Sequence, residues 1–230
     1  MEEESGWLCL VPTPIGNLDD MTFRALKVLQ ACDRVLAEDT RTSGQLLKHF
    51  EINKPLSAFH QHNEHRVRER WADAVAEGQK LALLSDAGTP GLSDPGHSLV
   101  SVCLERHLPV EVLPGPTAFL PALLLSGLPN HCFAYEGFLP LKKGRQKKLS
   151  MLAEEERTLV FYESPHRMEK LLTELADHFG TGRKASISRE ISKKFEETLR
   201  GTVGELLDLW RQHPRKGEMV ITVEGRHAKS

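Results

Sequence analysis

Between two apolar segments the sequence reads Ser85-Asp86-Ala87-Gly88-Thr89-Pro90-Gly91-Leu92-Ser93-Asp94-Pro95-Gly96. The segment before it, 80–84, is typical of a buried parallel strand, and the segment after it, 98–104, is typical of a helix. Three glycines and two prolines in twelve residues exclude the interior of either element. In open α/β sheets ligands bind at the carboxyl ends of strands, where small residues let the backbone approach them closely. The stretch is therefore predicted to be a ligand-binding loop, with an ordinary turn as the alternative.

Short apolar segments alternate with helical patterns in the first half of the chain. Besides 80–84, strands are expected at residues 7–11, 34–37, 56–59 and 110–113. Between the first two strands Phe23, Leu26 and Leu29 recur every three residues, and Asp19 or Asp20 is expected to cap the helix that they define. This alternation predicts a parallel sheet covered on both faces, with all strand-end loops at one edge.

The pattern changes after residue 130. The segment 118–125 is apolar on all sides and is expected to be buried, and 126–130 is the expected boundary. An amphipathic helix is expected at 168–179, among strands at 133–138, 158–162, 185–189, 195–199 and 219–223, of which the third and fourth are expected to be antiparallel. The predicted fold class is α/β with two α/β domains: residues 1–127 with a parallel sheet, and residues 128–230 with a mixed sheet.

The composition is that of an ordinary globular protein, with 40% apolar and 27% charged residues. No segment approaches the roughly 18 apolar residues of a membrane span, and the acidic start Met1-Glu2-Glu3-Glu4 is unlike a secretory signal or transit peptide. Four scattered cysteines without a CxxC pair predict reduced thiols. We therefore expect a cytoplasmic protein without a membrane partner. The formal net charge of −2 excludes a chain that is basic throughout, but not a local basic surface.

Several common kinds of chemistry lack their motifs. The first strand leads into Pro12-Thr13-Pro14-Ile15-Gly16-Asn17, which has one glycine where a dinucleotide-binding motif has three. The absence of GxxxxGK[ST] and GxSxG argues against a P-loop and a serine hydrolase. His60, His62 and His65 resemble zinc ligands, but spacings of two and three give no single ligand face on a helix. A polar strand-end loop is the preferred interpretation, and no metal is predicted.

Two polar segments in the second half each allow a structural and a functional interpretation. The run Lys142-Lys143-Gly144-Arg145-Gln146-Lys147-Lys148 is either a solvated loop before a helix or a clamp for phosphate groups. Glu163-Ser164-Pro165-His166-Arg167 places a carboxylate, an imidazole and a guanidinium at a strand end, although Ser164 and Pro165 are also typical of a helix start. The residues alone leave these alternatives open.

Six segments carry a resemblance to known proteins: Leu10–Leu18, Ala37–Arg41, Ser85–Gly96, Leu113–Ala118, Phe161–Arg167 and Lys216–Val220. In this order they resemble the ribosomal RNA small subunit methyltransferase I family, a branch of the tetrapyrrole methylase (class III) superfamily. The resemblance implies an S-adenosylmethionine-dependent enzyme, usually a homodimer, with the donor in a cleft between two domains. The implied reaction is 2′-O-ribose methylation of one cytidine in the decoding region of 16S rRNA, as naked RNA or within the small ribosomal subunit.

The resemblance also implies which residues bind the methyl donor: Ile15, Ala87, Gly88, Thr89, Leu92, Thr117, Ala118, Glu163 and Ile191. The first loop departs from the superfamily pattern, which is usually glycine-rich. We expect the RNA to be held by Asp39, Arg41, His62, Asn63, Glu64, Lys142, Lys143, Arg145, Lys147 and Lys148.

A sulfonium methyl carbon is already activated, so the protein has to align the ribose oxygen and accept its proton. His62, Asp86 and Glu163 are the candidate bases, and His62 is preferred because an imidazole is partly neutral at working pH. Orientation of the ribose is the alternative role for His62. A small-molecule methyltransferase of the tetrapyrrole type fits the near-neutral charge better but fits the polar segment around His62 worse. A sensor that binds S-adenosylmethionine without catalysis is a further alternative.

Overall fold

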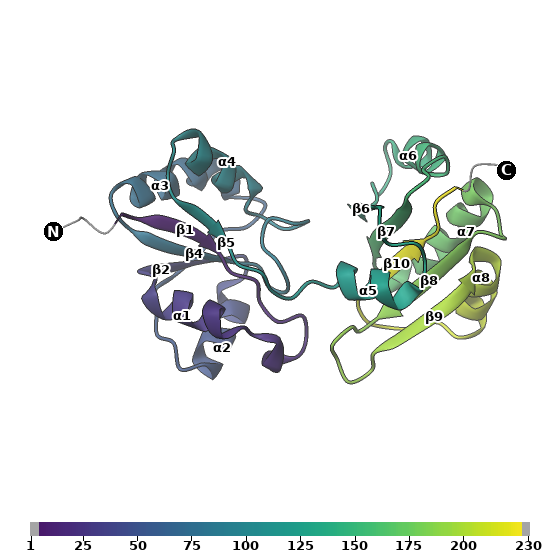
Figure 1. The fold of residues 1–230 in the computed structure, drawn as a ribbon, viewed down its shortest axis with the longest axis horizontal. Helices are drawn as coiled ribbons and strands as arrows, with labels where there is room; N and C mark the ends of the chain where they lie inside the picture. The colour runs from purple at the N-terminus through teal and green to yellow at the C-terminus, as the bar shows by residue number, and fades with distance from the viewer. Residues whose placement is uncertain (1–4, 227–230) are drawn as a thin grey trace. The chain divides into compact units, whose positions relative to one another are not determined.

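The computed structural model describes residues 5–226, so the acidic start Met1–Glu4 lies outside the described residues. The chain divides into two compact units, residues 1–117 and 118–230. Figure 1 shows that each unit contains a sheet with its own helices. The division falls at residue 117, whereas the sequence pattern placed it at residue 127, so the apolar segment after Thr117 belongs to the second unit.

The first unit contains a five-stranded parallel sheet. Its strands are β1 (Trp7–Leu10), β2 (Arg34–Ala37), β3 (Leu56–Ala58), β4 (Lys80–Leu84) and β5 (Val110–Val112). They lie in the order β3-β2-β4-β1-β5, and every pairing is parallel. The register sets Leu10 beside Leu83 and Ala37 beside Leu84, so the carboxyl ends of three strands meet. The predicted parallel sheet is confirmed.

This sheet is covered by α1 (Phe23–Ala31), α2 (Thr40–His49), α3 (Glu64–Ala76) and α4 (His97–Glu105). Helices α1 and α2 lie on one face and α3 and α4 on the other (Figure 1). Both faces are apolar because successive residues of β1 point to opposite faces. Leu8 packs in the hydrophobic cluster with α3 and α4, and Cys9 packs in the cluster with α1 and α2.

The start of α1 differs from the sequence-based expectation. Thr22, rather than Asp19 or Asp20, caps the helix by accepting a hydrogen bond from the N–H of Ala25. Of the three apolar residues that recur in this helix, Leu29 is fully buried, whereas Phe23 is 86% exposed. The helix therefore begins one turn later than the acidic pair suggested, and its first residue faces solvent.

The second unit contains a mixed five-stranded sheet. Its strands are β6 (Phe133–Phe138), β7 (Thr158–Glu163), β8 (Lys184–Arg189), β9 (Glu197–Thr202) and β10 (Met219–Val223). The order is β6-β7-β10-β8-β9; β6 and β7 are parallel and the other pairings are antiparallel. The predicted mixed sheet and the antiparallel β8–β9 pair are confirmed, although β9 begins at Glu197 and not at Phe195.

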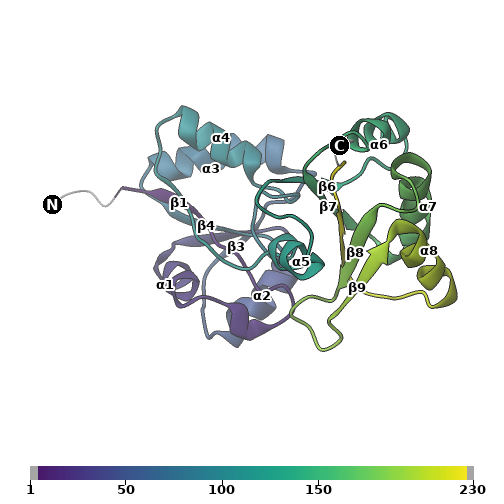
Figure 2. The same ribbon diagram turned by 45° about the vertical axis from the view of Figure 1, so that its right-hand side comes forward.

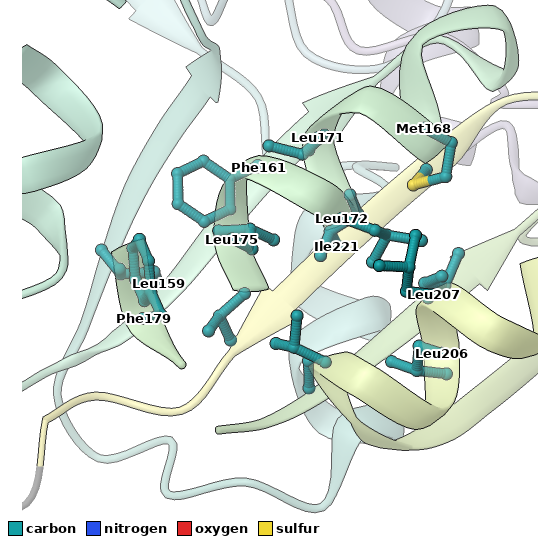
Figure 3. Packing of buried hydrophobic residues seen from close by; sticks show 14 of the residues in the cluster. Leu159, Phe161, Met168, Leu171, Leu172, Leu175, Phe179, Leu206, Leu207 and Ile221 are labelled. Carbon is teal, nitrogen blue, oxygen red and sulfur yellow. The ribbon is translucent and has the colours of Figure 1, made fainter. Parts of the chain in front are cut away.

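One face of this sheet packs on α6 (Arg145–Leu152), α7 (Met168–Phe179) and α8 (Val203–Gln212). Figure 3 shows Phe161 and Ile221 of the sheet among Leu171, Leu172 and Leu175 of α7. Helix α5 (Phe119–Ser126) lies on the opposite face (Figures 1 and 2). The expectation that α5 is buried on all sides is wrong, because Leu120 and Leu124 are 43% and 67% exposed.

Within the described residues, no helix combines the length and the apolar character that crossing a membrane requires. Cys9, Cys32 and Cys103 are free and buried, and burial raises the pKa of each thiol to about 11. These thiols therefore stay protonated and unreactive at neutral pH.

Candidate active site

The loops that follow the strands of the first sheet share one edge, because all five strands are parallel. They include the segments 11–17, 38–39, 59–63, 85–96 and 113–117. Strand β4 lies between β2 and β1, so the loop Ser85–Gly96 is central among them. The topology thus brings together the strand-end segments that the sequence singled out in this unit.

Backbone hydrogen bonds join the central loop to the first loop. The N–H of Thr13 donates to the carbonyl of Gly88 at 2.9 Å, and the N–H of Gly88 donates back at 3.0 Å. The hydroxyl of Thr13 also donates to the carbonyl of Ser85 at 3.2 Å. Gly88 has φ +82°, and a Cβ there would lie 3.5 Å from the side chain of Ile15. Glycine therefore lets the central loop turn directly over Ile15.

The loop after β5 is fixed to the same structure. The hydroxyl of Thr89 donates to the carbonyl of Pro116 at 3.1 Å. A Cβ on Gly115 would lie 2.6 Å from the Cβ of Pro12, so only glycine allows this contact between loops. Three strand-end loops therefore form one wall whose shape is set by backbone contacts rather than by long side chains.

Several carboxyl groups lie in the central loop and in the neighbouring segment that follows β2. The side chain of Asp86 accepts the N–H of Asp39 at 3.1 Å. Burial, followed by the charges of Glu38 and Asp86, raises the pKa of Asp94 to about 7, against a lowering hydrogen bond from Ser85. Burial and then Asp86 also raise the pKa of Glu38. Neither Glu38 nor Asp94 is among the residues expected from the sequence, although they lie in the segments Ala37–Arg41 and Ser85–Gly96.

Two histidines lie beside this cluster at the end of β3. The rings of His60 and His62 are 6.0 Å apart and meet edge to face. His62 is exposed, whereas Nδ1 of His60 is buried and has no hydrogen-bond partner among the described residues. His60 contributes to the electrostatic environment of Glu38 by lowering its pKa against the larger effect of burial. This edge therefore combines imidazoles with two carboxyl groups whose pKa values are raised, that of Asp94 to about 7.

Three of the expected RNA-binding residues in this unit hold the local backbone. Asp39 caps α2 and pairs with Arg41 at 2.6 Å, and the hydrogen bonds from Arg41 lower the pKa of Asp39 to about 2. Asn63 accepts the N–H of His60 and donates to the carbonyl of Ala58. Glu64 accepts the N–H of Gly96 and the hydroxyl of Ser98. The side chain of Arg41 is 86% exposed and reaches into solvent.

In the second unit Glu163 is deeply buried, with its side chain 1% exposed. Its Oε1 accepts from Nε of Arg167 at 2.7 Å and from the N–H of Ser164 at 2.8 Å. A second guanidinium, that of Arg145, lies 3.7 Å from Oε2. These donors occupy the carboxylate oxygens, so the oxygens are not open to a substrate hydroxyl. The geometry instead gives Glu163 the role of fixing the strand-end loop 164–167.

The basic run separates into buried and exposed members. Arg145 is 4% exposed; it donates to Glu174 at 2.8 Å and to the carbonyl of Pro140 at 3.0 Å. Lys148 pairs with Glu136 at 2.7 Å. The expectation that Arg145 faces RNA together with the lysines does not fit this placement. Lys142, Lys143 and Lys147 are exposed.

The remaining expected donor residues occupy varied positions. Ala87 in the central loop is exposed, and Leu92 in the same loop is 36% exposed. Thr117 is the last residue of the first unit and Ala118 the first residue of the second. Ile191 is buried in a loop where Glu190 and Ser192 have φ of +50° and +66°. These positions do not test the assignments, which stay predictions.

The described part of the chain contains no group of three or more His, Cys, Asp or Glu side chains arranged to hold a metal ion. The zinc interpretation of His60, His62 and His65 therefore gains no support from geometry. His60 is half-buried, whereas His62 and His65 are exposed.

Comparison with known proteins places the chain in a class. Residues 8–207 match the family model described as Tetrapyrrole (Corrin/Porphyrin) Methylases. The fold is also found in uroporphyrin-III-C-methyltransferase from Thermus thermophilus, at TM-score 0.63 and 23% identity over 95% of this chain and 94% of that one. Diphthine synthase gives TM-score 0.76 at 13% identity, over 97% of this chain and 92% of that one. The chain belongs to the tetrapyrrole methylase family and is an S-adenosylmethionine-dependent methyltransferase.

Within this family, relatives with one name cover nearly the whole chain. Ribosomal RNA small subunit methyltransferase I of Escherichia coli O157:H7 is 48% identical over 99% of this chain and 81% of its own length. The protein of the same name from Streptococcus pyogenes serotype M1 is 43% identical over 100% of this chain and 80% of its own length. The resemblance identified from six motifs is thereby confirmed.

Proposed function

We propose that this protein transfers a methyl group from S-adenosylmethionine to the ribose 2′-oxygen of a cytidine in the decoding region of 16S rRNA. The observation that carries the proposal is 43–48% identity, over nearly the whole chain, to relatives named for small-subunit ribosomal RNA methylation. The wall formed by the loops after β1, β4 and β5 supports a small ligand at this edge. We further propose a cytoplasmic homodimer that acts on the small subunit.

The donor site is proposed to include Ile15, Ala87, Gly88, Thr89, Leu92, Thr117, Ala118 and Ile191. The fit rests on Gly88, because a side chain there would extend from a strained backbone into the space in front of Ile15. Main-chain groups of the linked loops would hold the donor, and buried Ile15 would offer it an apolar surface. Glu163 would act indirectly, by fixing its loop. When bound, the donor supplies an electrophilic methyl carbon.

The chain's own task is to orient the ribose hydroxyl and to accept its proton. His62 and Asp86 are the proposed proton acceptors, because both are exposed at the sheet edge. The neighbouring Asp94 carboxyl, whose pKa is raised to about 7, is partly protonated near neutral pH. Arg41 is proposed to bind a phosphate of the RNA. Asp39, Asn63 and Glu64 would keep these groups in place through the contacts described above.

The proposal is tested with labelled S-adenosylmethionine and small ribosomal subunits from a strain that lacks the modification. The label is expected on one ribose of a cytidine in the decoding region, located by nuclease mapping and mass spectrometry. Label on a base, or on another nucleotide, would contradict the proposed reaction. Donor binding without transfer to subunits or naked RNA would favour a sensor, and transfer to a tetrapyrrole alone would favour a small-molecule methyltransferase.

The proton acceptor is tested by single-turnover methylation at saturating donor and RNA. His62→Ala is expected to reduce the rate by about 100-fold if the imidazole accepts the proton. His65→Ala is the matched control, because His65 is an exposed histidine three residues away. A near-normal rate for His62→Ala together with a large loss for Asp86→Asn would transfer the role to Asp86.

A further inference from the structure

A row of aromatic rings crosses β6 and β7 of the second unit. Ring centroids are 5.5 Å apart from Phe138 to Tyr162, 5.5 Å from Tyr162 to Tyr135, and 4.7 Å from Tyr135 to Phe119. We call these four residues the aromatic row. Phe138 is 55% exposed, whereas the other three are half-buried. The row therefore ends in an open aromatic surface that packing of the unit does not use.

An irregularity in β6 sets the direction of Phe138. Side chains three positions apart in a regular strand point to opposite faces, so Tyr135 and Phe138 would be separated by the sheet. The pairing with β7 shifts between Tyr135 and Gly137, and Gly137 has φ +59°. The bulge at Glu136 thus turns Phe138 to the face of Tyr135 and places it opposite Tyr162. Bulges commonly re-aim side chains beside functional sites.

Two basic residues, Lys142 and Lys143, follow the exposed end of the row four and five positions later in the chain. Lys142 and Lys143 are exposed, and neither forms an ion pair within residues 5–226. Their turn is held by Arg145, whose N–H donates to the carbonyl of Lys142 at 3.2 Å and whose guanidinium donates to that of Pro140 at 3.0 Å. Because Arg145 is anchored on buried Glu174, the two lysines extend from a fixed turn that begins at Pro140, two residues after Phe138.

We propose that Phe138 stacks on an unpaired base of the substrate RNA, while Lys142 and Lys143 bind phosphates on either side of that base. An aromatic face accepts any base, and lysines bind the backbone without reading sequence. This surface would therefore hold a single-stranded segment in place while another part of the protein selects the nucleotide. The inference rests on the proposed function for the identity of the RNA, but not for the binding itself.

Stacking is tested by fluorescence anisotropy with a labelled single-stranded RNA of about 12 nucleotides, a length within the usual range of site sizes. Phe138→Leu, which keeps an apolar side chain but removes the ring, is expected to weaken binding about 10-fold. Phe138→Trp is expected to retain affinity, and RNA is expected to quench the fluorescence of the introduced indole. Phe195→Leu is the matched control, since Phe195 is 64% exposed and has Lys194 5.7 Å from its ring.

The charges are tested by the salt dependence of the same binding. The negative slope of log K against log salt is expected to become about 1.4 less steep in Lys142→Gln/Lys143→Gln, because each phosphate contact on a single strand contributes about 0.7. Phe138→Leu should leave this slope unchanged. Lys27→Gln/Lys170→Gln removes the same charge from other exposed positions and should keep the wild-type slope. Equal slopes for both double variants would overturn the phosphate assignment.

Binding and methylation are scored separately. Wild-type methylation of subunits combined with unchanged RNA affinity in Phe138→Leu would refute the stacking surface and leave the proposed function intact. RNA affinity that depends on Phe138, in a protein that methylates no ribose, would refute the proposed function and leave the surface intact. A loss for Phe195→Leu equal to that for Phe138→Leu would show non-specific adhesion and also refute the inference.

Discussion

The two sheets hold carboxylates at their strand ends in opposite ways. At the edge of the first sheet, Asp94 and Glu38 lie near Asp86, and burial with like charge raises the pKa of both. At the end of β7 in the second sheet, Glu163 accepts from Arg167 and lies against Arg145, which also binds Glu174. The first arrangement leaves groups able to exchange protons, whereas the second fixes the backbone. The comparison indicates chemistry in one unit and a rigid support in the other.

The largest expected effect comes from removing the buried ion pairs of Arg145 in the second unit. Arg145→Met leaves Glu163 and Glu174 buried without their shared cation, which should reduce the free energy of unfolding by about 3–5 kcal/mol. The half-buried pair of Lys148 with Glu136 provides the control, and Lys148→Met should cost less than about 1 kcal/mol. Urea unfolding measures both. Equal losses of stability in the two variants would show that Arg145 supports the fold no more than the half-buried Lys148 does.

A second change disturbs the wall formed by the linked loops. Gly115→Ala places a Cβ against Pro12, and the resulting overpacking should cost about 1–3 kcal/mol. Donor affinity, measured by calorimetry, should fall because the loops after β1 and β5 are forced apart. Gly182→Ala is a suitable control, because a Cβ there meets nothing within 4 Å. Unchanged donor affinity in folded Gly115→Ala would separate these loops from the donor site.

Asp94 should make stability depend on pH. Its pKa is raised from 3.8 to about 7 on folding, so between these values the folded state binds more protons and stability falls as pH rises. Asp94→Asn should remove this dependence and stabilise the protein at pH 8 by about 1 kcal/mol, a figure that allows for solvent screening of a partly exposed group. At pH 3 the two proteins should be nearly equal. Chemical unfolding across this range provides the measurement.

Asp39, at the same edge of the first sheet, should show the opposite pH dependence. Its pKa is lowered to about 2 by Arg41, so its stabilising contribution is present above pH 4 and is lost as pH falls through 2. Asp39→Asn should therefore lose stability at pH 7, where Asp94→Asn does not. Matching pH profiles for the two variants would contradict the electrostatic description of this edge.

The smallest expected effect concerns hydroxyls. Thr222 in β10 is fully buried, and its Oγ1 has no hydrogen-bond partner among the described residues. Thr222→Val should be neutral or stabilise the protein by up to about 1 kcal/mol. Thr13→Val should destabilise it by a similar amount, because the Thr13 hydroxyl bonds to Ser85. Thermal unfolding distinguishes the two signs.

The sequence predicted those features that depend on local patterns. Apolar segments bounded by Gly and Pro fixed the strands, and their alternation with helices predicted the parallel sheet. The cap of α1 was misplaced because three nearby residues, Asp19, Asp20 and Thr22, all have capping side chains. Local composition could not decide which of them the tertiary structure would use.

The features that were missed depend on residues distant in the chain. Arg145 stands within a basic run, but its partner Glu174 is 29 positions away. The pKa of Asp94 depends on Glu38, which reaches it through the neighbouring strand β2. The bulge at Glu136 is visible only once β6 is paired with β7. Burial and partner identity, rather than residue type, decide the roles of these side chains.

The central position of β4 has a consequence for synthesis on the ribosome. Strands β1 and β2 do not pair with each other, because both pair with β4. At about 5–20 residues per second, roughly 2–10 s pass between completion of Ala37 and of Leu84. During that interval both strands present open edges to other growing chains. The first unit is therefore most exposed to misassembly while its fourth strand is still being made.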